Sequence, residues 1–172
     1  MLHQERHHHR RIRTWLASLT ALALSVLLWV SGTTSAQAND YTKEILLNAD
    51  FAGQNLTDSS FTKANLKNAT FKGSNLSGVS FFGANLEDVN LEGADLRVAT
   101  LDSARLVQAN LTNTLLEGAF AASTQFEEAI ITGADFTDVD LSKRTQEQLC
   151  ERATGTNPTT GRATRETLGC DG

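Results

Sequence analysis

The chain has 172 residues and a formal net charge of −5, and this length is sufficient for one domain with a hydrophobic core. Residues 1–38 contain four of the 15 Lys and Arg and one of the 20 Asp and Glu, so the rest of the chain holds 11 basic and 19 acidic residues, a net charge of −8. This acidic balance argues against a nucleic acid partner, because binding would release no counterions from phosphates.

Residues 1–38 have the three parts of a secretory signal peptide. Four arginines precede an uncharged apolar run from Trp15 to Val30, and Ala36-Gln37-Ala38 supplies a cleavage motif of small residues. We predict cleavage after Ala38, so that the mature chain begins at Asn39 and has no stable membrane insertion. An uncleaved anchor is the alternative, although the run is shorter than the ~20 residues of a membrane span.

The arginines and histidines of this segment raise two other readings. Arg10-Arg11 is compatible with the twin-arginine export route, but Arg13 and Thr14 lie where that signal has bulky apolar residues, so general secretion is preferred. His7-His8-His9 invites a metal-binding interpretation, but it lies in the part to be removed. We therefore predict no metal site and no cofactor.

A single five-residue period runs through residues 44–143, after a lead-in of residues 39–43. The residue two positions before each central apolar residue is small in most repeats, as in Ala64 and Ala84. A fixed internal period predicts a stack of equivalent structural units. The central column is the predicted structural core: Leu46, Phe51, Leu56, Phe61, Leu66, Phe71, Leu76, Phe81, Leu86, Leu91, Leu96, Leu101, Leu106, Leu111, Leu116, Phe126, Ile131, Phe136 and Leu141.

This period is incompatible with a regular helix or strand. Five residues advance an α-helix by about 500°, which would scatter the column over the whole surface, and strand side chains alternate with a period of two. A chain that turns a corner in every repeat accounts for the pattern. Residues 20 apart at one corner tolerate positive φ, which indicates four repeats per coil and a left-handed turn there: Gly53, Gly73, Gly93, Asn113 and Gly133.

The tripeptides Ala64-Asn65-Leu66, Ala84-Asn85-Leu86 and Ala94-Asp95-Leu96 resemble the A-(D/N)-L motif of the pentapeptide-repeat family. The resemblance extends over all 20 repeats of residues 44–143. It implies an all-β solenoid, a right-handed quadrilateral β-helix, in which 20 repeats over four sides make about five coils. The residues after Lys143 predict a short C-terminal α-helical cap on this solenoid.

Ala121 is the one small residue in the central column. It leaves space in the core, which either stays empty or is filled by rotation of Phe120. Because protein interiors are close-packed, we expect a local distortion of the coil at this position.

Residues 144–172 are predicted to form the helical cap with a disulfide. Thr145-Gln146-Glu147-Gln148 has the pattern of a capping box that opens a short helix, and Leu149 and Ala153 would then face the last coil. Gly155 and Asn157-Pro158 are expected to end this helix. Such a cap covers the apolar side chains and unpaired backbone groups of a terminal coil.

Cys150 and Cys170 are the only cysteines. In an exported chain such a pair predicts a disulfide, which contributes about 2–4 kcal/mol. A zinc site is disfavoured because no histidine follows the signal peptide, and a redox-active pair is the alternative. The repeats, the Leu149-Cys150 helix and the Leu168-Gly169-Cys170 terminus are similar to lumenal pentapeptide proteins of thylakoids. The thylakoid lumen is therefore the first expected compartment, and the periplasm or secretion the second.

We expect a non-catalytic protein that acts as a rigid scaffold for an unidentified protein partner, with self-association through one end of the solenoid as a further expectation. One alternative is redox regulation through Cys150 and Cys170. Another, implied by the resemblance to family members that mimic DNA, is binding to a topoisomerase, which export disfavours because gyrase is cytoplasmic. No residue is put forward as catalytic. Several carboxylates could serve glycoside hydrolysis but are interpreted as a solvated face: Glu87, Asp88, Glu92, Asp95, Glu127 and Glu128.

Overall fold

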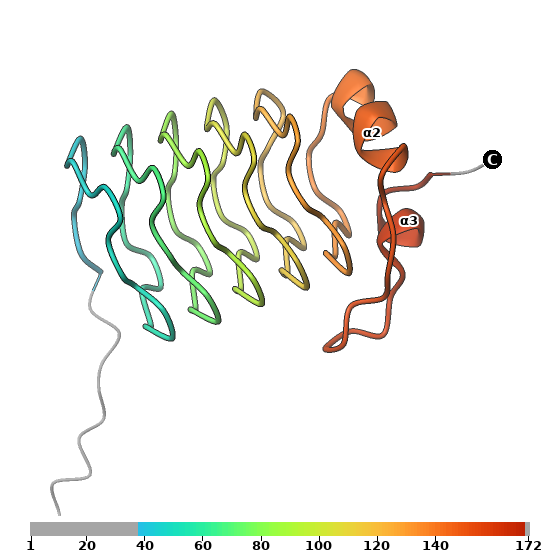
Figure 1. Cartoon of the computed structure of the whole chain (residues 1–172), viewed down its shortest axis with the longest axis horizontal. Coiled ribbons are helices and arrows are strands. Elements are labelled where there is room, and N and C mark those ends of the chain that lie inside the picture. The colour runs from blue at the N-terminus through green and yellow to red at the C-terminus, as the bar shows by residue number, and fades with distance from the viewer. Residues whose placement is uncertain (1–37, 171–172) are drawn as a thin grey trace, which may run out of the picture. The chain divides into compact units, whose positions relative to one another are not determined.

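The computed structural model describes residues 38–170 (Figure 1), so most of the predicted signal peptide lies outside the described residues. Within them the chain forms a stack of coils over residues 40–140, which we call the solenoid. Helices α2 (Lys143–Cys150) and α3 (Thr164–Thr167) follow at its C-terminal end.

Parallel β-bridges between residues 20 apart hold the coils together, from Asp40 and Ser60 to Phe120 and Asp140. Four five-residue repeats therefore make one coil. Each bridge is isolated, because the chain pairs through a single residue and then turns the next corner. The coil has four sides, which we number by their first central residues: Tyr41 (side 1), Leu46 (side 2), Phe51 (side 3) and Leu56 (side 4).

The corners of the coil use a left-handed residue two positions after the central one. Positive φ values of 53° to 71° recur at each fifth position from Lys43 to Asp138, with Ser123 as the exception. The sequence predicts this conformation at one corner only, because only that column is rich in Gly and Asn. At the other corners even a β-branched residue, Val98, has positive φ. The backbone hydrogen bonds between neighbouring coils, which we call the ladder, hold this strained conformation in place.

The residue before the central one fixes the turn that follows. Its short polar side chain accepts a hydrogen bond from the N–H two positions later, as from Ala52 to Asp50 Oδ1 (2.9 Å) and from Glu92 to Asn90 Oδ1 (3.0 Å). The ladder offers this N–H no backbone acceptor, so the side chain satisfies a donor that would otherwise depend on water. The Asp or Asn of the repeat is therefore a turn-forming residue.

The central column fills the interior, and its aromatic members stack along the solenoid axis. The ring centroids of Phe51 and Phe71 on side 3 are 4.9 Å apart, and the opposite side 1 has the same stacked arrangement. The predicted core positions are buried except at the two ends of the column, where Leu46 and Leu141 are only partly buried.

The repeats begin earlier than predicted. Asp40 already pairs with Ser60, and Tyr41 occupies a central position with its ring centroid 4.6 Å from that of Phe61 in a stacked arrangement. Residues 39–43 therefore open the first coil and are not a lead-in. The ring of Tyr41 packs in the central column as a phenylalanine would.

Ala121 is buried, and Phe120 does not fill the space beside it. Phe120 forms a regular bridge with Thr100, and its ring is exposed. The distortion lies instead in the next turn, where Ser123 lacks the positive φ of the other corners and its N–H donates to Asp102 Oδ1 (3.4 Å). A small core residue makes fewer packing contacts, so the adjacent turn is held less firmly to the regular geometry.

Helix α2 begins directly after Ser142, whose Oγ accepts a hydrogen bond from the Thr145 N–H (3.1 Å). The predicted start at Thr145 was wrong by one turn, because the hydroxyl at the end of the last side is the first one placed to cap the helix. The helix also ends before Ala153, which is buried together with Leu149. Residues 151–163 return across the last coil and lead into α3, which the sequence analysis did not predict.

Candidate interaction surfaces

A buried asparagine joins the cap to the last coils. Asn157 is fully buried, and its Nδ2 donates to the carbonyl oxygens of Gly133 (2.8 Å), Asn113 (3.2 Å) and Thr114 (3.4 Å). Its Oδ1 accepts from the Thr159 N–H (2.9 Å). From the sequence, Asn157 is predicted only to end a helix, because its acceptors lie 24 to 44 residues earlier in the chain.

An ion pair reinforces the same junction. Arg162 of the cap contacts the buried carboxylate of Asp135 (Nε to Oδ2, 2.9 Å) and the exposed carboxylate of Glu117 (Nη2 to Oε2, 2.8 Å). Burial by itself raises the pKa of Asp135, but hydrogen bonds from Thr137 and Thr160 and the charge of Arg162 outweigh it, so the pKa lies below its usual value. This carboxylate stays ionised and structural.

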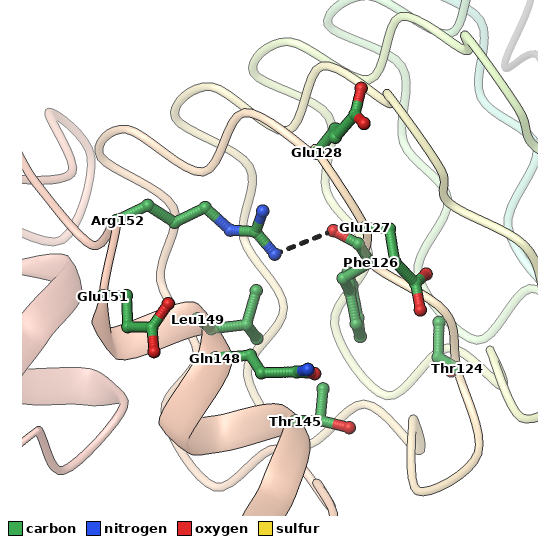
Figure 2. Close-up of a pocket in the computed structure, with 9 residues that line it drawn as sticks. All are labelled: Thr124, Phe126, Glu127, Glu128, Thr145, Gln148, Leu149, Glu151 and Arg152. Carbon is green, nitrogen blue, oxygen red and sulfur yellow. Dashed lines mark hydrogen bonds between the residues drawn. The ribbon is translucent and has the colours of Figure 1, made fainter.

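The recess between the last coil and α2 has a volume of about 350 Å³ and is shown in Figure 2. Arg152 reaches across it and donates from Nη2 to the Phe126 carbonyl (3.0 Å). Glu127 and Glu128 both line the recess, but the Glu128 carboxylate points away from Arg152 and accepts a hydrogen bond from Gln108 Nε2 (2.8 Å). The two glutamates singled out in the sequence therefore face different surroundings and do not converge on one point.

The carboxylates on side 2 form ion pairs with basic residues of neighbouring coils. Lys67 Nζ lies 2.7 Å from Glu87 Oε1 and 3.6 Å from Asp88 Oδ2, and Arg105 Nη2 lies 3.4 Å from Glu87 Oε2. The hydrogen bond from Lys67 holds the pKa of Glu87 below its usual value. A general acid of a glycosidase needs a raised pKa, so this environment is the opposite of what that chemistry requires.

Exposed apolar side chains interrupt the polar surface. Phe82 on side 1 is 42% exposed and Phe120 on the same side is 49% exposed, while Ile130 is exposed on side 3. None of the three is predicted from the sequence as a surface feature. A signal was available, because Phe120 and Ile130 occupy the turn-capping position where most repeats have Asp, Asn, Ser or Thr.

Cys150 and Cys170 form a disulfide with their Cα atoms 5.5 Å apart, and it links the end of α2 to the residues after α3. Arg165 Nη1 donates to the Cys150 carbonyl beside it (2.9 Å). Within residues 38–170, no cluster of His, Cys, Asp and Glu is arranged to hold a metal ion. The helices in this part of the chain are also too short or too polar to span a membrane.

The predicted cleavage bond between Ala38 and Asn39 lies at the start of the first coil. Ala38 is exposed, and the Asn39 N–H donates to Ser59 Oγ (3.1 Å) while its carbonyl accepts from the Ser60 N–H (2.9 Å). Cleavage after Ala38 stays a prediction, and it would leave the first bridge of the solenoid intact.

Comparison with known proteins identifies the family. The family model described as pentapeptide repeat region matches residues 44–120, and the one described as pentapeptide repeats (8 copies) matches residues 104–142. The chain belongs to the pentapeptide-repeat family. Pentapeptide-repeat proteins are right-handed quadrilateral β-helices, in agreement with the predicted fold class.

Solved pentapeptide-repeat structures resemble this chain over most of its length. The crystal structure of a pentapeptide-repeat protein from the thylakoid lumen of Arabidopsis thaliana is 41% identical, with a TM-score of 0.58, and the match covers 80% of this chain and 88% of that one. A pentapeptide-repeat protein from Nostoc is 25% identical, with a TM-score of 0.50, over 74% of this chain and 95% of that one.

Curated relatives match over short segments. An Arabidopsis thaliana protein named thylakoid lumenal 15 kDa protein 1 is 58% identical over 41 residues, and one named thylakoid lumenal protein TL20.3 is 52% identical over 40 residues. These segments are 24% and 23% of this chain and only 18% and 14% of the two relatives.

Proposed function

We propose that this pentapeptide-repeat protein is a non-catalytic scaffold that binds a protein partner through side 1 of the solenoid. The observation that carries the proposal is the exposure of two phenylalanine rings, Phe82 and Phe120, on that side. Exposed aromatic rings are unfavourable in water and are enriched at the centres of protein interfaces.

The surroundings of the two rings suit a protein interface. Thr100 and Asp102 lie on the coil between them, and farther along side 1 the hydroxyls of Thr62 and Ser80 are 2.9 Å apart. Polar groups of this kind form the rim that surrounds an apolar interface core. Because the ladder hydrogen-bonds each coil to its neighbours, binding would order little additional backbone, which favours affinity.

We further propose that the protein acts after export, in the thylakoid lumen, with the periplasm as the second compartment. The support comes from the signal-peptide pattern of residues 1–38 and from the lumenal names of the Arabidopsis relatives.

The test is affinity capture of partners from the protein's own compartment, with the exported protein as bait. Wild type is compared with the double variant Phe82→Ser/Phe120→Ser and with Ile130→Ser, which removes an exposed apolar side chain from side 3. We expect a specific protein to be recovered with wild type and with Ile130→Ser and to be lost with the double variant. Recovery that is unaffected by the double variant contradicts the assignment to side 1.

Redox regulation is a second candidate, favoured by the disulfide that ties the cap together. Reduction would free the segment after α3 from α2 and loosen the cover of the last coil. The double variant Cys150→Ser/Cys170→Ser mimics the reduced state. Capture that depends on the cysteines supports this candidate, whereas equal capture by both forms supports a purely structural disulfide.

A further inference from the structure

The hydrogen-bond ladder has a direction, so the two ends of the solenoid differ chemically. On each side, two N–H groups donate to the following coil, as from Phe61 to the Ser80 carbonyl (2.7 Å) and from Lys63 to the Phe82 carbonyl (2.8 Å). One N–H donates to the preceding coil, as from Ser80 to the Ser59 carbonyl (3.1 Å). The N-terminal end therefore presents two carbonyls for each N–H, and the C-terminal end presents the reverse.

The cap matches the donor excess at the C-terminal end. The Thr154 carbonyl accepts from the Gly133 N–H (2.8 Å), and Thr167 Oγ1 accepts from the Phe136 N–H (3.0 Å). The cap thus supplies acceptors where this end of the ladder has donors. A segment that covers an end of the solenoid must complement the hydrogen-bonding groups of that end.

No described residue covers the N-terminal end. Among residues 38–170, the carbonyls of Ile45, Leu47 and Ala52 have no hydrogen-bond donor, and the N–H groups of Ile45 and Asn55 have no acceptor. Such an unpaired edge is a template for an added segment.

Apolar surface and negative charge accompany the unpaired carbonyls. Ile45 is 75% exposed and Leu47 is 49% exposed, and Tyr41 is only partly buried. The first coil carries one basic residue, Lys43, and the following acidic residues, none of which forms an ion pair within the described part of the chain: Asp40, Glu44, Asp50 and Asp58.

We propose that this N-terminal end of the solenoid is a docking site for a basic, partly apolar segment of a partner protein. Arginine and lysine side chains have donors and no acceptors, so they satisfy the excess carbonyls and the carboxylates at once. Apolar residues of the segment cover Ile45 and Leu47. The site is separate from the aromatic rings of side 1, and its chemistry is different.

A second copy of the chain suits this end poorly. Two identical N-terminal ends facing each other would set excess carbonyls against carbonyls, and the carboxylates of Asp50 and Asp58 against those of the other copy. Like charges opposed across an interface disfavour its formation. The C-terminal end, which has the complementary donors, is occupied by the cap.

The probe is a synthetic peptide of alternating Arg and Val, about ten residues long, with a Glu/Val peptide of the same length as its control. Binding to the exported protein is measured by fluorescence anisotropy at low and high salt. Hydrogen exchange of the amides of residues 45–55 reports whether the peptide lies on the open edge. We expect the Arg/Val peptide to bind, to protect these amides, and to dissociate at high salt, whereas the Glu/Val peptide does not bind.

Two variants test the site without disturbing the fold. Ile45→Asn installs the side chain that normally caps this turn, so we expect unchanged or higher thermal stability together with about tenfold weaker peptide binding. Asp50→Asn/Asp58→Asn retains the capping acceptor and a residue that tolerates positive φ, and should weaken binding about tenfold by removing charge.

The matched controls are Ile130→Asn on side 3 and Asp138→Asn/Asp140→Asn near the other end of the solenoid, and both should bind the peptide as wild type does. Phe82→Ser/Phe120→Ser should also bind it, which separates this site from side 1. Equal binding by Ile45→Asn, binding of the Glu/Val peptide, or no binding of either peptide overturns the proposal. So does a dimer in solution that Ile45→Asn abolishes, because a second copy would then be the occupant.

Discussion

Replacement of Asn157 by aspartate tests how the cap stabilises the solenoid. Asp has nearly the same shape, but it exchanges the amide group that donates to Gly133, Asn113 and Thr114 for an oxygen. A buried carbonyl left without a partner costs about 1–3 kcal/mol. The Thr114 carbonyl keeps its bond from the Asp135 N–H (2.9 Å), so only the carbonyls of Gly133 and Asn113 lose their donor. With the full cost at Gly133 and a smaller one at Asn113, Asn157→Asp should lower the free energy of unfolding by about 2–4 kcal/mol.

The loss should depend on pH. A carboxyl at this buried position faces carbonyl oxygens, so its folded-state pKa is expected to lie above the unfolded value of about 3.9. Such a group lowers the free energy of unfolding most when pH is above its folded-state pKa, because the buried carboxylate is then ionised. The free energy of unfolding of the variant should therefore lie further below that of wild type at pH 8 than at pH 5.

The assay is urea unfolding of the oxidised protein, followed by circular dichroism, with Asn48→Asp as the matched control. Asn48 is exposed in the first coil and has a left-handed φ of 56°, so the same chemical change there should alter stability by no more than about 0.5 kcal/mol. The reasoning is refuted if Asn157→Asp lies within about 1 kcal/mol of this control at both pH values.

Three further predictions concern other parts of the fold. Val98 is an exposed β-branched residue with φ of 53°, so Val98→Asn should raise the free energy of unfolding by about 1 kcal/mol, and no gain in urea midpoint would contradict this. Cys150→Ser/Cys170→Ser should lower the free energy of unfolding by about 2–4 kcal/mol, and the same midpoint would show if the disulfide adds nothing. Because the folded-state pKa of Asp135 is lowered, its ionised form stabilises the protein above the unfolded pKa of about 3.9, and this contribution is lost as pH falls. The stability difference between wild type and Asp135→Asn should accordingly shrink between pH 7 and pH 3; a constant difference would argue against this role.

The turn chemistry shows where prediction from the sequence stopped short. The Gly and Asn column from Gly53 to Gly133 indicated four repeats per coil, and the bridges between residues 20 apart have that spacing. It did not indicate that other corners are left-handed too, because Lys63 and Val98 have no intrinsic preference for positive φ. Neighbouring coils impose that conformation through ladder hydrogen bonds.

The surfaces proposed for binding show a similar division. Phe120 and Ile45 could be recognised in the sequence as apolar residues at the turn-capping position, once the role of that position was known from the hydrogen bonds of residues such as Asp50. The donor and acceptor imbalance of the two ends could not be read from side chains at all, because it belongs to the backbone.

The sequence by itself determined the core and the four-sided coil, because the five-residue period places the same kinds of residue in every coil. It also determined the cysteine pair, because the chain has only two cysteines. Only the tertiary structure decided that residues 39–43 belong to the first coil, the course of the cap and the buried position of Asn157. These depend on single contacts between residues 20 or more apart, which no repeating pattern records. The repeating part of such a fold can be predicted from the sequence because every coil makes the same contacts. The structure of its ends depends on contacts that occur only once.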